Sequence, residues 1–317
     1  MTNRTGVKLT AERDVPFLRE LYVDNVLRWS TAQRYFYPGT SKETFYNRVL
    51  QLKKAGYINF PSREQSQAKA IPDKFFWLGD KGIAFIAGEH GLEVDVSKLT
   101  SDKKRKDLIK VLKRQKLYWR PGPAWSNVTH DLIQADIRLI ARSAAEKIGL
   151  EWGGWTAELE FRADPQLQVV TYTAIVEDKG NTQQVKQDAK VFPDGFFYVT
   201  RPAAKPGKVD DFVFLVEVDR GTEPMYRIFD EKILQGQAYL KSPLYEQRTG
   251  FNVGRFLIIT TGPTRLANIK RKAETATRKP SHYFAVLSDL TPDTFFSKPV
   301  WYLLGREEPL PLLPPVK

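Results

Sequence analysis

Residues 212–219, with the sequence FVFLVEVD, form an apolar run that ends in two acids, Glu217 and Asp219. The Phe and Val residues of this run are typical of a buried β-strand. A second apolar run follows the triplet Pro193-Asp194-Gly195. If the two strands pair, Asp194 and Glu217 approach each other at one end of a sheet. Because neighbouring carboxylates repel each other unless a cation lies between them, we predict that Asp194 and Glu217 bind Mg²⁺ or Mn²⁺.

The composition is that of a globular protein, with 42% apolar and 12% aromatic residues in a chain of 317. The chain has no cysteine, which excludes disulfides, zinc sites built on thiolates and cysteine nucleophiles. No apolar run reaches the ~20 residues of a membrane-spanning helix, and the N-terminus lacks the apolar core of a signal peptide. We therefore expect a cytoplasmic protein without a membrane partner.

The net charge of +12 is unevenly distributed along the chain. Residues 1–120 contain 24 Lys and Arg against 13 Asp and Glu, whereas residues 121–317 contain 25 against 24. Such an asymmetry indicates a nucleic-acid-binding module followed by a neutral domain. A general contribution to solubility is the alternative interpretation.

The first 90 residues have the pattern of a winged-helix domain. Helices are predicted over 11–22, 31–37 and 41–55, and strands over 57–60 and 74–78. Ser41 can cap the third helix and Gly56 can end it. Three helices followed by a two-stranded wing are the order expected of a winged helix-turn-helix.

On this interpretation the third helix enters the major groove of duplex DNA. Its polar face carries the candidate base-contacting residues Lys42, Thr44, Asn47, Arg48 and Gln51, and its end carries the candidate phosphate contacts Lys53 and Lys54. An ordinary solvated helix face, or a surface that docks a protein, is the alternative.

Residues 91–125 are predicted to form a basic helical linker. Its candidate DNA contacts are Lys103, Lys104, Arg105 and Lys106, and the apolar residues between 108 and 117 keep a roughly helical period. A solvated connector is the alternative. Pro121-Gly122-Pro123 indicates the end of the linker.

The remaining residues, 126–317, are predicted to form a mixed sheet flanked by helices, so that the fold class is α/β within an α+β chain. Beside the two acidic strands, we predict strands over 156–162, 169–177, 255–261 and 283–287, helices over 131–148, 224–240 and 264–275, and a polar segment over 179–190 that is hairpin-like or loose.

This order, with Pro193-Asp194 and Glu217 in place, resembles the PD-(D/E)xK nuclease superfamily and its restriction-endonuclease-like fold. The resemblance implies that Asp194 and Glu217 bind magnesium and that a lysine two residues after the second acid helps to activate water. Asp219 stands at that position, where it would assist or orient, and Lys232 is a candidate substitute. Gln235 and Tyr239 resemble the Q-x-x-x-Y motif of exonuclease-like branches, in which the glutamine lies near the active site.

Each of these residues also has a structural interpretation. Pro-Asp-Gly is a common turn. Glu217 and Asp219 can end a strand or cap the following helix. Tyr239 can pack in the core while Gln235 binds a buried backbone group.

Several stretches together resemble the bacterial replication-relaxation family, which is found largely on plasmids and other mobile elements. They are residues 9–14, 48–56, His130 and the helix after it, Trp155, Pro193-Asp194-Gly195, residues 217–222 and residues 232–239. The resemblance implies a winged-helix reader fused to a nuclease-like domain that acts in plasmid replication or DNA relaxation.

Three functions follow from the sequence. The first is a DNA-binding protein that nicks or cleaves DNA with magnesium. The second is a non-catalytic replication or transcription regulator whose nuclease-like domain dimerises. The third is an adaptor whose winged helix docks a protein. Expected partners are double-stranded DNA, a second copy of the chain, and replication or mobilisation proteins.

Overall fold

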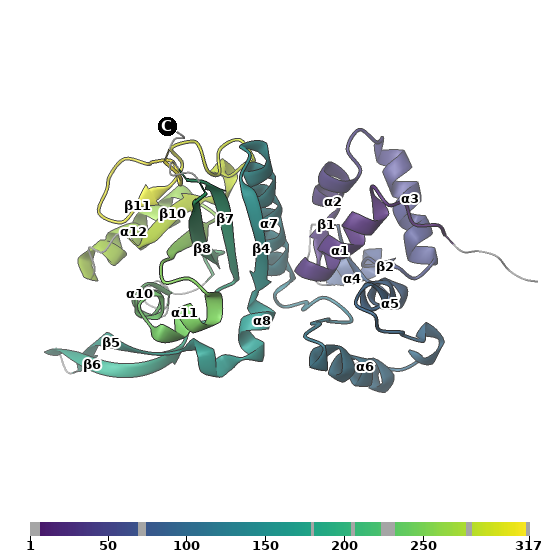
Figure 1. The fold of residues 1–317 in the computed structure, drawn as a ribbon, viewed down its shortest axis with the longest axis horizontal. Helices are drawn as coiled ribbons and strands as arrows, with labels where there is room; N and C mark the ends of the chain where they lie inside the picture. Colours follow the sequence, from purple (N-terminus) through teal and green to yellow (C-terminus); the bar gives the residue numbers. More distant parts are fainter. Residues whose placement is uncertain are drawn as a thin grey trace, which may run out of the picture. The chain divides into compact units, whose positions relative to one another are not determined.

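The structure is a computed structural model that describes residues 7–68, 74–178, 181–203, 207–222, 232–276 and 281–314. The chain divides into an N-terminal unit, Met1–Asp136, and a C-terminal unit, Ile137–Lys317. Helices and strands occur in both units (Figure 1), which confirms the predicted α+β class. The division falls within helix α7 (Val128–Lys147).

The N-terminal unit contains short helices around a small antiparallel sheet of order β1-β3-β2. Its elements are α1 (Asp14–Asp24), β1 (Leu27–Arg28), α2 (Trp29–Phe36), α3 (Lys42–Lys54), β2 (Ile58–Asn59), α4 (Arg63–Ala68), β3 (Phe75–Leu78), α5 (Asp80–Glu89), η1 (Val96–Lys98) and α6 (Asp102–Arg114). The three predicted helices, two strands and basic helix are present, whereas β1, α4 and α5 were not predicted.

Helix α3 forms where its local signals place it. The Ser41 hydroxyl accepts the Thr44 N–H at 3.1 Å and so satisfies a donor that the first turn leaves open. Phe45, Val49 and Leu52 are fully buried on one face. Gly56 then adopts a φ of +84°, the left-handed conformation that commonly ends a helix.

Helix α5 was missed because glycine is a poor helix former. Gly82 lies in its first turns, and a Cβ there would come 2.2 Å from the Tyr57 carbonyl oxygen. The glycine is therefore required by the close approach of α5 to the chain before β2.

The C-terminal unit contains a six-stranded mixed sheet of order β11-β10-β9-β8-β7-β4, in which β8, β9 and β10 are parallel. Its elements after α7 are β4 (Glu151–Ala157), α8 (Glu158–Ala163), η2 (Pro165–Gln168), β5 (Val169–Asp178), β6 (Asn181–Lys190), β7 (Gly195–Pro202), β8 (Val209–Asp219), α10 (Gln235–Leu240), α11 (Pro243–Thr249), β9 (Arg255–Thr260), α12 (Pro263–Ala276), β10 (His282–Val286), η4 (Leu287–Asp289) and β11 (Tyr302–Leu303).

The side chains of strand β8 point alternately to the two faces of the sheet, as in any β-strand. Val213 and Leu215 pack with Tyr239 of α10 and Tyr245 of α11. Phe214 points to the other face, against Phe197 and Phe296. Glu217 and Asp219 continue the odd-numbered set, so both acids are on the side of the sheet that bears α10 and α11.

One predicted strand is wrong, one polar segment forms a hairpin and one predicted helix is only partly described. The strand predicted over 156–162 is wrong, because β4 ends at Ala157 and the Glu160 carboxylate accepts the Ala157 N–H at 3.1 Å, which starts helix α8. The segment over 179–190, predicted to be hairpin-like or loose, contains β6, which pairs with β5 along its whole length in a separate two-stranded sheet (Figure 1). The helix predicted over 224–240 is described only from 232, where a π-helical turn leads into α10.

Candidate functional site

Asp194 lies immediately before β7, beside the end of β8. Its N–H donates to the Val216 carbonyl at 2.9 Å, and its Oδ2 accepts the Val218 N–H at 2.7 Å. Because Gly195 is the register partner of Val216, Asp194 is next to Glu217 on the neighbouring strand. The structure thus brings the two predicted metal ligands together, and both are buried.

Gly195 is required at this position by packing. A Cβ on this residue would come 2.0 Å from Cζ2 of Trp155, whose register partner on β7 is Phe197. The Pro193-Asp194-Gly195 triplet therefore combines a structural glycine with a buried acid.

Lys232 forms an ion pair with Glu217. The Glu217 side chain is 7% exposed and that of Lys232 is 29% exposed, so the pair is partly screened by solvent. Lys232 lies in the turn before α10 and not on β8. A cation therefore stands beside the second acid, although the strand itself does not supply it.

Asp219 is held in a separate network. Arg265 of α12 donates to it from Nε at 2.8 Å and from Nη2 at 3.2 Å. The Thr260 hydroxyl and the Gly221 N–H donate to it at 3.1 and 2.9 Å. Both carboxylate oxygens are thus hydrogen-bonded and link β8 to β9 and α12, an arrangement that favours a structural role for Asp219.

A cavity of about 370 Å³ contains three of the five predicted catalytic side chains, Glu217, Lys232 and Gln235. Its full lining is Glu158, Arg162, Ala189, Lys190, Val191, Phe192, Glu217, Lys232, Gln235 and Phe256. Tyr239, the other half of the Q-x-x-x-Y pair, is fully buried against Tyr245, and burial raises its pKa to about 12. Gln235 therefore faces the cavity while Tyr239 belongs to the core.

Glu158, Arg162 and Lys190 line this cavity but were not predicted as site residues. Arg162 Nε donates to Glu158 Oε1 at 2.7 Å, and its guanidinium lies 4.6 Å from the centre of the Phe192 ring. Glu158 and Arg162 are four residues apart on α8, so a helix brings them to one face. Because a strand was predicted over 156–162, the helical spacing of Glu158 and Arg162 gave no reason to pair them.

His282 lies behind the cavity wall. Its ring stacks on Phe256 with a centroid distance of 5.2 Å and an interplanar angle of 8°. Complete burial lowers the pKa of His282 to about 3, although the Lys232 backbone opposes this shift. His282 therefore stays neutral and packs, and it offers no acid–base group at physiological pH.

The residues present offer few protein ligands for a magnesium ion. Within the described ranges, no group of three or more His, Cys, Asp or Glu side chains is arranged to hold a metal. Asp194 and Glu217 remain as two adjacent carboxylates. Mg²⁺ commonly binds one or two protein carboxylates together with waters and substrate phosphates, so the pair meets its minimum requirement.

In the N-terminal unit, four of the five predicted base-contacting residues of α3 are exposed: Lys42, Thr44, Asn47 and Gln51. Of the predicted phosphate contacts, Lys54 is exposed and Lys53 lies 3.7 Å from the centre of the Phe60 ring.

Arg48 is the exception on α3. Its guanidinium forms a salt bridge with the fully buried Asp14 at the start of α1, with Nε donating to Oδ1 at 3.0 Å, and it also donates to the Lys8 carbonyl at 2.8 Å. Burial raises the pKa of Asp14, but hydrogen bonds from Arg48, the Thr10 N–H and Tyr37 outweigh burial and hold that pKa below its usual value. The group predicted to read bases therefore fastens α3 to α1.

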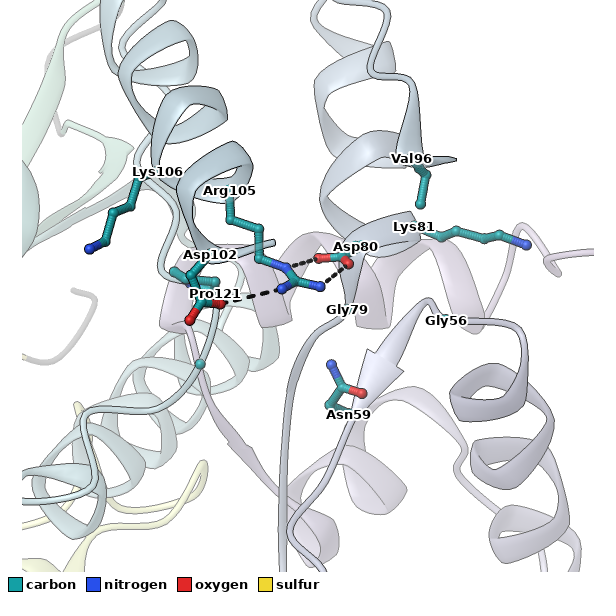
Figure 2. Close-up of a pocket in the computed structure, with 11 residues that line it drawn as sticks. Gly56, Asn59, Gly79, Asp80, Lys81, Val96, Asp102, Arg105, Lys106 and Pro121 are labelled. Atoms are coloured by element: carbon teal, nitrogen blue, oxygen red, sulfur yellow. Dashed lines mark hydrogen bonds and ion pairs between the residues drawn. The ribbon is translucent and has the colours of Figure 1, made fainter. Parts of the chain in front are cut away.

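Helix α6 likewise has exposed lysines and one arginine that bonds within the protein. Lys103, Lys104 and Lys106 are exposed, as a DNA contact requires. Arg105 instead donates to both oxygens of Asp80, at 3.0 and 2.7 Å, and to Asp102 at 3.5 Å (Figure 2). It connects α6 to the beginning of α5.

Comparison of the chain with protein-family models, with curated proteins and with solved structures finds no match. Among the described helices, none combines the length and the hydropathy needed to cross a bilayer.

Proposed function

We propose that this chain is a DNA-binding protein of a plasmid or other mobile element, and that its C-terminal unit nicks or cleaves a DNA strand with Mg²⁺. The observation that carries the proposal is the grouping of Glu217, Lys232 and Gln235 in one cavity, with Asp194 beside Glu217. Acids, a cation and an amide at one sheet end are what a nuclease-like fold needs for phosphodiester hydrolysis.

In this proposal Asp194 and Glu217 hold the metal at the ends of β7 and β8. When bound, Mg²⁺ neutralises charge on the phosphodiester and lowers the pKa of a coordinated water. Lys232, beside Glu217, supplies positive charge next to the attacked phosphate. Gln235 has both a donor and an acceptor with which to position the strand or the water.

The N-terminal unit supplies binding to double-stranded DNA. Its order of three helices followed by β2 and β3, with β1 as a third strand, supports a winged helix. Lys42, Thr44 and Asn47 of α3 are the proposed groove contacts, and the exposed lysines of α6 are the proposed phosphate contacts.

Plasmid nicking tests the enzymatic part of the proposal. Purified protein with Mg²⁺ or Mn²⁺ is expected to convert supercoiled plasmid to the open circle, and Asp194→Asn and Glu217→Gln are expected to abolish this conversion. Asp211→Asn is the matched control, because Asp211 is an exposed acid on the same strand β8. Intact plasmid with wild-type protein in both metals refutes the enzyme.

A non-catalytic DNA-binding regulator is the second candidate. The observation that favours it is that Glu217 and Asp219 already have cationic partners, Lys232 and Arg265. This candidate predicts salt-sensitive binding of duplex DNA without cleavage in either metal. Replacing Lys42 and Asn47 by Ala is expected to weaken that binding, and unchanged affinity would exclude α3 as the contact.

A further inference from the structure

We infer that Arg162 and Lys190 bind a phosphate of a separated nucleic-acid strand in the cavity that contains Glu217 and Lys232. The inference rests on the proposed function, because it assigns the two residues to the substrate of the same site. Arg162 comes from α8 and Lys190 from the end of β6, so two different elements supply the donors.

The charges that line the cavity favour an anionic ligand. The lining has three cations, Arg162, Lys190 and Lys232, against two carboxylates, Glu158 and Glu217. Lys232 pairs with Glu217 and Arg162 pairs with Glu158. Lys190 has no ion-pair partner within the described part of the chain, so the excess positive charge resides there.

The geometry of Arg162 suits a phosphate. Its guanidinium lies over the Phe192 ring and pairs with Glu158 through Nε and Nη2, which restricts its orientation and leaves Nη1 for a ligand. The side chain is nevertheless 54% exposed, so a ligand can reach it. A guanidinium held in one plane presents its N–H groups as a fork that matches phosphate oxygens.

The size of the cavity favours a single strand over a duplex as the ligand. A volume of about 370 Å³ is at the lower end of the range for small-molecule sites. It has room for a short segment of a separated strand, whereas a base-paired duplex could present only a backbone phosphate at the rim. Enzymes that act on buried positions of duplex DNA commonly take the target out of the stack, so a separated strand is a reasonable substrate class for such a cavity.

Lysine acylation tests the inference directly on the full chain. The protein is labelled in EDTA with and without a 5′-phosphorylated single-stranded tetranucleotide, and the labelled lysines are quantified by mass spectrometry. Labelling of Lys190 is expected to fall severalfold when the oligonucleotide is added. Lys186 is the matched control, because it is exposed on the same strand β6, and its labelling is expected to stay constant. Equal labelling of Lys190 in both samples overturns the inference.

Two further ligands identify the source of the phosphate. Inorganic phosphate at the same concentration is expected to leave Lys190 labelled, and full protection by it would indicate a small-anion site and contradict the strand. A base-paired duplex of the same sequence is expected to protect Lys190 less than the single strand, and equal protection would contradict a separated strand.

Titrations of the tetranucleotide give the second readout. Replacing Arg162 and Lys190 by Gln is expected to weaken binding and to reduce the slope of log K against log salt by about 0.7, since the two residues share one phosphate and each single-strand phosphate contact contributes about 0.7. Lys186→Gln is expected to change neither quantity. The Arg162 pair is largely exposed, so the double variant is expected to fold normally.

These readouts require no cleavage, so the two proposals can fail separately. If the wild-type protein never nicks plasmid but Lys190 is protected, the nuclease fails and the strand-binding subsite stands. If the protein nicks plasmid while Lys190 stays unprotected and the double variant binds normally, the subsite alone is refuted.

Discussion

The ion pair between Arg265 and Asp219 gives the sharpest test of which acids are structural. The Asp219 side chain is 5% exposed and that of Arg265 is 20% exposed, so the pair is largely desolvated. Removal of one partner from a buried pair typically costs ~3–5 kcal/mol. Thr260 and Gly221 still donate to Asp219 when Arg265 is absent, which places the expected cost at the lower end. We predict that Arg265→Ala lowers the free energy of unfolding of the C-terminal unit by about 3 kcal/mol.

Differential scanning calorimetry measures this loss, since about 3 kcal/mol shifts the transition of a unit this size by roughly 6–12 °C. Arg271→Ala is the matched control on the same helix, because Arg271 is exposed and bonds only to Asn268 among the contacts described. It is expected to change stability by less than about 0.5 kcal/mol.

A double-mutant cycle with Asp219→Asn completes this test. Because the two side chains share one interaction, the double variant is expected to lose less stability than the sum of the single variants, by ~1–3 kcal/mol. If Arg265→Ala is as stable as Arg271→Ala while nicking or DNA binding is lost, Asp219 acts in the site and the structural assignment is refuted.

Three further predictions concern acid, packing and capping. The folded pKa of Asp14 lies below the unfolded value of about 3.9, so the stability that Asp14 contributes is present above that pH and is lost as pH falls through the folded pKa. In urea unfolding from pH 6 to 2, Asp14→Asn is therefore expected to reduce the loss of stability at acidic pH, and an unchanged loss contradicts this. Gly195→Ala is expected to cost ~1–3 kcal/mol in thermal unfolding, with partial rescue by Trp155→Phe, and the absence of rescue would exclude the predicted clash. Ser41→Ala is expected to cost about 1 kcal/mol in urea unfolding through loss of the α3 cap, and an unchanged midpoint would show that the cap is dispensable.

Elements with local signals could be predicted from the sequence. Helix α3 has a capping serine, an apolar period and a terminal glycine, and it forms within one residue of the predicted bounds. Strand β8 has a continuous apolar run, which is sufficient because both faces of its central part are covered. The approach of Asp194 to Glu217 follows from pairing these strands, because a triplet before one strand and an acid near the end of its antiparallel neighbour meet at the same edge.

The partners of charged residues could not be predicted, because they come from distant parts of the chain. Arg48 lies on the exposed side of α3 by its helical period, yet it reaches Asp14, which lies 34 residues earlier. Arg265 similarly reaches Asp219 across 46 residues. A period or a motif gives the face on which a side chain lies, whereas its partner depends on which elements pack beside that face. Functional assignments of arginine are therefore less secure from sequence than those of the exposed lysines.

The ion-pair partners of Glu217 and Asp219 bear on why an acid and not a lysine stands at position 219. Side chains of residues 217 and 219 project to one face of β8, but they lie beside different elements: Lys232 precedes α10, and Arg265 belongs to α12. A lysine at 219 would stand next to Arg265, where a second cation is unfavourable. The cation beside Glu217 comes from elsewhere in the chain, from Lys232. A charged pair of Glu217 and Lys232 is thus present next to Asp194, although Lys232 lies 15 residues after Glu217 in the sequence.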